Sequence, residues 1–387
     1  MIPYSRQLID GKDIKTVIKT LKSDLVTTGP KVPEFEKKIK NFLGVKYCVA
    51  VNSATSALHL ACIALNLKKN DWLWTSPISF VASANCGLYC GAKVDFVDID
   101  ENTYNISIDK LKKKLALAKL KKKLPKIIVI VNLAGQPCDL FEIKKLSKTY
   151  NFKILEDSSH ALGAKYKGAK VGNGKFTDVS VFSFHPVKII TTLEGGAATT
   201  NNKKIYQKIE MLRSHGITRD KKLLKKYNNN SWYYEQQLLG YNYRMNDIEA
   251  ALGISQLSKI NKFFKKRTYV KKFYDYHLKN LPLILPHFEK NKTSSLHLYI
   301  VRLKENFSRS IRDKIINKLR NKGIGVNIHY IPIHFQPYFK KMGFKKGMFP
   351  MSEKYFDSAI SLPIHPGITR NHLIKIVKTI KSILTNE

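Results

Sequence analysis

The chain has 387 residues, 43% of them hydrophobic and 11% aromatic, and a formal net charge of +39. This length and composition exclude a disordered chain and predict a globular protein with two domains. The charge suggests a nucleic-acid partner, but only ten of the 68 basic residues are arginine and the lysines are spread along the whole chain. We therefore expect no nucleic-acid partner.

The sequence also indicates where the protein works. No apolar run is as long as a membrane span, and the first residues, MIPYSRQLIDGKD, lack the charged and apolar pattern of an export signal. Five cysteines are scattered along the chain, and Cys86 and Cys90 are predicted to be buried as small apolar residues on a helix. We expect a reduced, cytoplasmic protein with no membrane partner and no metal site.

Up to residue 245 short apolar runs alternate with amphipathic or small-residue runs. The apolar runs predict strands at 47–51, 72–75, 94–99, 126–131, 152–157 and 179–184. The other runs predict helices at 12–22, 33–43, 57–67, 79–91, 107–118 and 140–150. Alternating strands and helices predict an α/β fold with a mostly parallel sheet, buried on both faces because the strands lack strict apolar–polar alternation. The stretch 219–231, rich in lysine and asparagine, is predicted to be an exposed loop.

The pattern of predicted helices and strands changes after residue 245. Residues 246–280 predict a long helix with a break near 260. They are followed by a strand at 296–303, a helix at 308–322, a strand at 325–333 and a helix at 369–384. We therefore predict a large α/β domain over 1–245 and a smaller α+β domain over 246–387.

Four motifs follow predicted strands or precede a helix, where ligands of parallel sheets bind. Residues 52–56 read NSATS, which suits a phosphate at a helix start but also an ordinary helix cap. Asp157 ends a strand, where it can pair with a ring cation or cap a helix. Ser183 lies in an apolar run, and a solitary Lys188 lies beside it. The fourth motif, residues 240–245, precedes a helix.

Together these motifs point to one cofactor. A phosphate cradle, a buried carboxylate and an isolated lysine are the three contacts that pyridoxal 5′-phosphate requires. A lysine in apolar surroundings is costly unless it is paired, neutralised or used covalently, and Lys188 stands between Val187 and Ile189. The sequence contains no GxGxxG or GxxxxGK[ST] loop to support a rival cofactor.

The order of these motifs carries a family resemblance. NSATSALH, SPISFVASAN, EDSSHALGA, SFHPVKIITTLEGG and GYNYRMNDIEAALG follow one another along the chain. This order resembles the DegT-type sugar aminotransferases, which are fold-type I enzymes that use pyridoxal 5′-phosphate on nucleotide-linked keto sugars. The resemblance covers residues 2 to about 380. It implies a large domain with a mostly parallel sheet, a smaller C-terminal domain and a homodimer with shared active sites.

The resemblance assigns roles to individual residues. Lys188 matches the Schiff-base lysine, which also moves protons, and Asp157 matches the partner of the cofactor's ring nitrogen. His160 matches a side chain near the cofactor oxygen, so these three are the implied catalytic residues. The implied cofactor-binding residues are Ala54, Thr55, Phe80, Asp157, Ser183, Lys188 and Asn242. Of these, Asn242 matches a residue that reaches the phosphate of the neighbouring subunit.

Further segments, among them IPYSRQ, VTTGPKVPEFE and HYIPIHFQPYF, are closest to the subgroup of the pseudaminic acid pathway. That resemblance implies amino transfer from L-glutamate to C4 of UDP-2-acetamido-2,6-dideoxy-β-L-arabino-hexos-4-ulose. The implied substrate-binding residues are Tyr4, Asp24, Leu25, Val26, Thr27, Ala54, Ser183, Asn242, His329, Tyr330, Ile331 and Pro332. Two alternatives stay open: an aminotransferase for a D-configured sugar of the bacillosamine type, and a non-enzymatic binding protein on the same fold.

Overall fold

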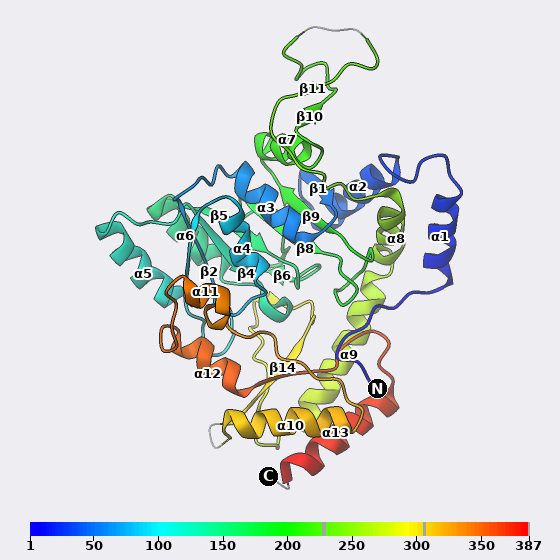
Figure 1. The fold of residues 1–387 in the computed structure, drawn as a ribbon. Coiled ribbons are helices and arrows are strands. Elements are labelled where there is room, and N and C mark those ends of the chain that lie inside the picture. The colour runs from blue at the N-terminus through cyan, green and yellow to red at the C-terminus, as the bar shows by residue number, and fades with distance from the viewer. Residues whose placement is uncertain (227–229, 305–306, 386–387) are drawn as a thin grey trace.

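The computed structural model describes residues 1–226, 230–304 and 307–385. Figure 1 shows a larger body built around a central sheet and, below it, a second body that contains β14 and the C-terminal helices. Both ends of the chain lie at the second body (Figure 1). Within the described ranges, no helix is both long and apolar enough to cross a membrane.

The central sheet has seven strands in the order β1-β9-β8-β5-β4-β2-β3. They are β1 (Tyr47–Val51), β2 (Trp72–Thr75), β3 (Lys93–Phe96), β4 (Ile127–Val131), β5 (Lys153–Asp157), β8 (Val179–Ser183) and β9 (Gly196–Thr200). The pairs from β3 through β2, β4 and β5 to β8 are parallel, whereas β9 is antiparallel to both β8 and β1. The prediction of a mostly parallel sheet is confirmed, and the register places Val131 beside Asp157 and Asp157 beside Val181.

Helices cover both faces of this sheet. The helices of the larger body are α1 (Gly11–Leu21), α2 (Lys31–Leu43), α3 (Ala54–Ala64), α4 (Ala82–Tyr89), α5 (Ile108–Leu120), α6 (Leu140–Tyr150) and α7 (Lys203–Leu212). On one face α3, α4 and α7 pack in a single apolar cluster with β1, β2, β4 and β8. On the other face α2 packs over β1, β8 and β9, and α5 and α6 pack over β2, β4 and β5. The strands are therefore buried on both sides, as their apolar composition predicts.

The second body is built on a small antiparallel sheet in the order β12-β14-β15. Its elements are α9 (Ile260–Leu278), β12 (Leu283–Ile284), β14 (Tyr299–Leu303), α10 (Arg309–Asn321), α12 (Pro350–Ser358), β15 (Ala359–Leu362) and α13 (Arg370–Thr385). Helix α11 (Pro337–Lys341) packs through Phe339 in the apolar cluster of the larger body. The predicted break near 260 is confirmed, because α8 (Asp247–Leu257) ends just before α9 begins. Since α8 packs against α1 and α2, the proposed division at residue 245 stays a prediction.

The predicted strand at 325–333 is wrong. The segment makes only an isolated bridge, between Asn327 and Ser361, and it ends in a short 3-10 helix at Ile333–Phe335. Pro332 has no N–H to donate, and the hydroxyl of Tyr355 donates to the carbonyl of His329 at 2.6 Å. Isolated backbone bonds, such as those between Asn327 and Ser361, and side chains together satisfy this segment instead of a continuous strand pairing, and residues 327–330 border a cavity.

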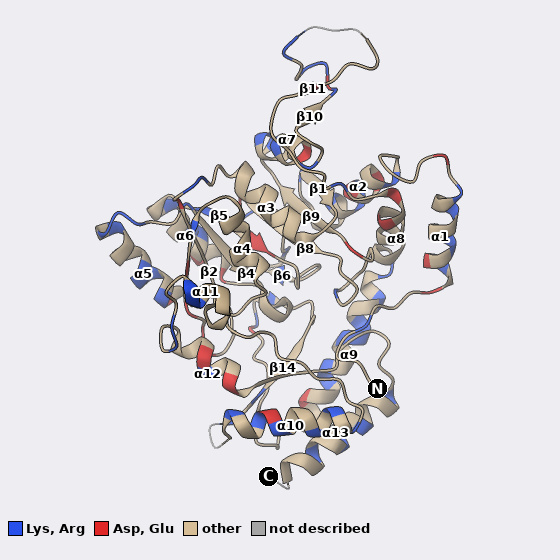
Figure 2. Ribbon diagram, in the orientation of Figure 1, with Lys and Arg blue, Asp and Glu red and all other residues tan. Residues whose placement is uncertain are grey.

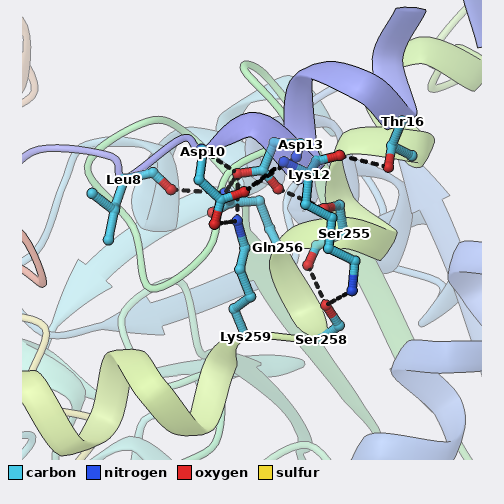
Figure 3. Close-up of polar contacts among 9 residues, drawn as sticks. All are labelled: Leu8, Asp10, Lys12, Asp13, Thr16, Ser255, Gln256, Ser258 and Lys259. Atoms are coloured by element: carbon cyan, nitrogen blue, oxygen red, sulfur yellow. Dashed lines mark hydrogen bonds and ion pairs between the residues drawn. The ribbon is translucent and has the colours of Figure 1, made fainter. Parts of the chain in front are cut away.

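Helix α1 is held to the larger body by its polar side. Asp13 is fully buried and accepts hydrogen bonds from Ser255 Oγ at 2.6 Å and Gln256 Nε2 at 2.7 Å. Lys259 Nζ lies 2.5 Å from Asp13 and 3.0 Å from Asp10. Figure 3 shows these side chains converging between α1 and the junction of α8 and α9. One buried carboxylate thus ties the N-terminal helix to the segment where the two bodies meet.

Short strands complete the fold. They are β6 (Lys165–Tyr166), β7 (Ala169–Lys170), β10 (Ile217–Thr218), β11 (Glu235–Gln236) and β13 (Lys292–Thr293). Figure 1 shows that β10, β11 and the segment between them project away from the body. The predicted exposed loop at 219–231 falls here, and its residues 227–229 lie outside the described residues. Trp232, Tyr234 and Leu239 on this projection are exposed.

Candidate active site

A cavity of about 410 Å³ lies at the carboxyl ends of the central strands. The larger body contributes residues at or after the ends of β1, β2, β4, β5 and β8, and the C-terminal part of the chain contributes His297 and the segment 327–330. Ten predicted site residues line the cavity: Tyr4, Ala54, Thr55, Phe80, Asp157, His160, Ser183, Lys188, His329 and Tyr330. The structure therefore brings together residues that are separated by most of the chain.

Lys188 follows β8 in a loop that the N-terminal segment holds in place. Its backbone N–H donates to His185 O at 2.9 Å, and Ser5 Oγ donates to Val187 O at 2.9 Å. Among the described residues its ammonium has no hydrogen-bond or ion-pair partner. Burial lowers the pKa of Lys188 from 10.5 to about 8, and the charge of Asp157 opposes this shift. At neutral pH the amine is still mostly protonated, but a far larger fraction of it is neutral than in a free lysine.

Asp157 is the last residue of β5, and it is 6% exposed. Its Oδ2 accepts from Ser83 Oγ at 2.6 Å and its Oδ1 accepts from the backbone N–H of Ser159 at 3.1 Å. Glu156, the preceding residue, is held on the opposite face by Ser180 and Asn132. Because successive strand residues face opposite ways, one carboxylate borders the cavity and the other is structural.

The start of α3 forms an anion-binding edge of the cavity. Ser53 caps the helix by accepting the N–H of Ser56 at 3.1 Å, and Ala54 and Thr55 begin the first turn, which carries no acidic residue. A Cβ on Gly196 would lie 2.5 Å from the backbone nitrogen of Ala54. Residue 196 must therefore be glycine for β9 to lie against this helix start, which presents free N–H groups to a phosphate.

His160 is held by the C-terminal part of the chain from three sides. Its Nε2 lies 3.0 Å from the hydroxyl of Tyr330, and its ring centroid lies 4.3 Å from that of His297. Ser295 Oγ donates to its backbone carbonyl at 2.5 Å. Burial, and then the charge of Lys188, lower the pKa of His160 well below its usual value, so the imidazole is neutral.

Aromatic side chains form the mouth of the cavity. Phe80 is 59% exposed, and its ring centroid lies 6.2 Å from that of Tyr330. Tyr4 lies with its ring centroid 5.2 Å from that of His329. An exposed Phe at a cavity mouth is available to stack on a planar ligand.

Seven predicted site residues do not line this cavity. They are Asp24, Leu25, Val26, Thr27, Asn242, Ile331 and Pro332. Asn242 and the 24–27 segment are exposed on the larger body, where Val26 O accepts the N–H of Asp247 at 3.0 Å. Their roles in the site stay predictions.

Several lining residues were not assigned by sequence. They include Ser159, Asn327 and His297, as well as Ser79, whose hydroxyl lies 2.7 Å from that of Ser83. Ser83 lies in the first turn of α4, whereas Ser79 precedes the helix, so helical spacing gave no signal for this pair. No sequence signal marked His297 as a site residue, because it lies in a predicted apolar strand.

The donor set fits pyridoxal 5′-phosphate. Lys188 is half-buried, and its amine has no partner among the described residues, which suits the cofactor's carbonyl. Asp157 offers a fixed carboxylate for the ring nitrogen, and the start of α3 offers N–H groups for the phosphate. Within the described ranges, no group of three or more His, Cys, Asp or Glu side chains is placed to hold a metal ion.

Comparisons with known proteins agree with this geometry. A transaminase of Campylobacter jejuni named for UDP-4-amino-4,6-dideoxy-N-acetyl-beta-L-altrosamine is 40% identical over 385 residues, which cover 99% of this chain and 98% of that protein. Helicobacter pylori PseC, an aminotransferase of pseudoaminic acid biosynthesis, superposes with a TM-score of 0.90 at 34% identity and full coverage of both chains.

The PLP form of Spr1654 from Streptococcus pneumoniae superposes with a TM-score of 0.89 at 30% identity, covering 100% of this chain and 99% of that one. The chain is thus a fold-type I aminotransferase, and pyridoxal 5′-phosphate is its cofactor. The sequence profile of the DegT/DnrJ/EryC1/StrS aminotransferases matches residues 7–381. The chain belongs to the DegT/DnrJ/EryC1/StrS aminotransferase family.

Proposed function

We propose that the chain transfers the amino group of L-glutamate to C4 of UDP-2-acetamido-2,6-dideoxy-β-L-arabino-hexos-4-ulose. The products are 2-oxoglutarate and UDP-4-amino-4,6-dideoxy-N-acetyl-β-L-altrosamine. The observation that carries this proposal is the unpartnered Lys188 amine in a cavity with Asp157, in a chain 40% identical to a transaminase named for that product.

The proposed roles follow from the contacts of each residue. Bound pyridoxal 5′-phosphate supplies an electron sink for the carbon that gains or loses a proton. Lys188, with its pKa lowered to about 8, removes and returns the proton at the reacting carbon. The Asp157 carboxylate, oriented by Ser83, keeps a proton on the ring nitrogen, and the start of α3 binds the phosphate. Phe80 and His160 line the same cavity, where Phe80 would stack on the ring of the cofactor and His160 would border it.

Sugar recognition is assigned to the cavity mouth. Tyr4, His329 and Tyr330 line it, and Ile331 and Pro332 continue the same segment. Burial raises the pKa of Tyr4, so its hydroxyl stays protonated and can donate to a sugar or phosphate oxygen.

The proposal includes a cytoplasmic homodimer in which each chain completes the other's site. Asn242 and the 24–27 segment are exposed and lie outside the cavity of their own chain. The adjoining outer face of α1 exposes Ile14, Ile18 and Leu21, an apolar stripe suited to contact with a second copy. The dimer would place Asn242 at the partner's phosphate and the 24–27 segment at its nucleotide sugar.

The test is amino transfer from nitrogen-labelled L-glutamate to two purified UDP-4-keto-6-deoxy sugars, the L-arabino compound and the D-configured compound. We expect labelled 4-amino product from the L-arabino sugar, identified by mass and NMR. Lys188→Ala should show no turnover, Asp157→Asn should be slowed by roughly 100-fold or more, and Lys113→Ala, an exposed lysine on α5, should match the wild type.

Labelled product from the D-configured sugar alone would show that the acceptor is a sugar of the bacillosamine type instead of the L-arabino sugar. Transfer to neither sugar, or full turnover by Lys188→Ala, would overturn the proposal.

A further inference from the structure

The segment between β13 and β14 places His297 in the wall of the active-site cavity. Its backbone is hydrogen bonded to the turn that follows β4. The N–H of Ser295 donates to Gly135 O at 3.1 Å. The N–H of His297 donates to Ala134 O at 3.0 Å. A Cβ on Gly135, whose φ is +92°, would lie 2.1 Å from Ser295 Oγ, so residue 135 must be glycine for the two segments to approach this closely.

Arg267, on α9, holds the same segment from its other side. Its side chain is fully buried, and its Nη1 donates to the backbone carbonyls of Leu296 at 3.0 Å and His297 at 3.2 Å. The same nitrogen donates to Ile364 O at 3.0 Å, which ties the segment to the chain that follows β15. The N–H and the carbonyl of His297 are therefore both used in hydrogen bonds, and these bonds fix the position from which its side chain enters the cavity wall.

The His297 ring packs against His160 and through it reaches Tyr330. The two histidines are buried, and their ring centroids lie 4.3 Å apart with an angle of 42° between the ring planes. The Nε2 of His160 lies 3.0 Å from the hydroxyl of Tyr330. A hydrogen bond at this nitrogen requires the hydroxyl to lie close to the plane of the imidazole ring. By packing on His160, the His297 ring restricts that imidazole to an orientation that meets this requirement.

We propose that His297 is a positioning residue for the nucleotide sugar, and that it acts through His160 on Tyr330. This inference rests on the proposed function, which assigns sugar recognition to the segment that contains Tyr330. With the His160 ring held in place, the Tyr330 hydroxyl has a fixed direction from which to hydrogen bond to a sugar oxygen. Asp157 is held by Ser83 instead, so the proposed contact with the ring nitrogen of the cofactor does not depend on His297. Removing the His297 ring should therefore impair the half-reaction with the sugar and spare the half-reaction with L-glutamate.

The test follows the two half-reactions of the holoenzyme separately. L-glutamate should bleach the absorbance of the bound cofactor, and the UDP-4-keto-6-deoxy sugar should restore it. For His297→Ala we expect the wild-type amount of bound cofactor and a rate of bleaching within about twofold of the wild type. The sugar concentration that gives half-maximal recovery should rise by roughly tenfold or more, with a much smaller change in the maximal rate, because the ring orients a binding contact.

Two further variants separate positioning from a general loss of packing. His297→Phe keeps a flat ring against His160 and should restore most of the sugar half-reaction. His365→Ala removes a histidine that is also buried in the second body but does not line the cavity, so it should not change the dependence on sugar concentration. If urea denaturation shows that His297→Ala does not fold, His297→Gln takes its place with the same expectations, because glutamine has no ring to pack on His160.

NMR of the full-length protein with nitrogen-labelled histidine gives a readout that needs no turnover. Tyr330→Phe removes the hydroxyl and should move the Nε2 signal of His160, which His160→Gln identifies. His297→Ala should move the same signal in the same direction, whereas His297→Phe should leave it nearer to its wild-type position.

Equal losses in both half-reactions, or the same change in His365→Ala, would show a general structural role and overturn the proposal. Failure of His297→Phe to restore the sugar half-reaction, or an unmoved His160 signal in His297→Ala, would overturn it as well. A failure of the proposed function looks different, because the wild type itself would then not recover with the sugar. The NMR comparison would still decide whether His297 positions His160.

Discussion

At the scale of single residues, Lys188 places an amine in a cavity where burial disfavours its charge. In the cofactor-free protein its pKa is about 8, against 10.5 for a free lysine. Between these values the unfolded chain binds a proton that the folded chain does not, so stability rises with pH from about 8 to about 10.5. Below pH 8 both states are protonated and the destabilisation is complete, at up to about 3 kcal/mol.

Lys188→Met should therefore raise the free energy of unfolding of the cofactor-free protein by up to about 3 kcal/mol at pH 7. Its advantage over the wild type should shrink as pH rises from 8 toward 10. Urea unfolding at both ends of this range measures the effect, with Lys113→Met on α5 as an exposed control. A constant difference across the range would contradict the lowered pKa.

Residue types explain which site residues could be predicted. Lys188 and Asp157 could be, because a lone charge beside an apolar strand has few purposes other than chemistry. Ser83 and His297 could not. Ser83 reaches the site only through its 2.6 Å contact with Asp157, and His297 reaches it only because a distant part of the chain packs it against His160. Such pairings are set by tertiary packing and leave no local pattern.

At the scale of elements, α1 is attached by a carboxylate rather than by its apolar residues. Asp13→Asn should lower the free energy of unfolding by about 2 kcal/mol, since it removes the charge facing Lys259 and one acceptor of the Ser255 and Gln256 bonds. Urea denaturation measures this, and Asp109→Asn, an exposed acid at the start of α5, should change stability by less than about 0.5 kcal/mol. Equal effects of the two variants would show that Asp13 does not anchor the helix.

Element prediction succeeded where composition and environment agree. The strands at 47–51 and 72–75 were predicted to the residue, because runs that contain aromatic and β-branched residues occupy mostly buried positions. Strand β9 was not predicted. Its sequence, GAATT, suits the close approach of β9 to α3 and to its two antiparallel neighbours. It does not have a strong intrinsic strand preference. Residues 325–333 show the opposite error, because their sequence predicts a strand but the segment borders the cavity instead.

At the scale of the whole molecule, the net charge of +39 has to be accommodated by a compact structure. Figure 2 shows lysine and arginine distributed over both bodies, including α5, α9 and α10. Raising NaCl from about 0.01 to about 0.1 M shortens the Debye length from about 30 to about 10 Å, which weakens this self-repulsion. We expect the melting temperature to rise by a few degrees. Calorimetry measures it, with sucrose as uncharged control, and a fall would contradict the prediction.

The cavity draws its walls from both bodies: Asp157 and Lys188 come from one, and His297 and Tyr330 from the other. A molecule held between them binds the folded state alone, because neither half-wall forms the complete site. By mass action it stabilises the fold by RT ln(1 + [L]/Kd), about 2.7 kcal/mol at a hundredfold excess over Kd. A ligand that contacts both walls should therefore couple the unfolding of the two bodies.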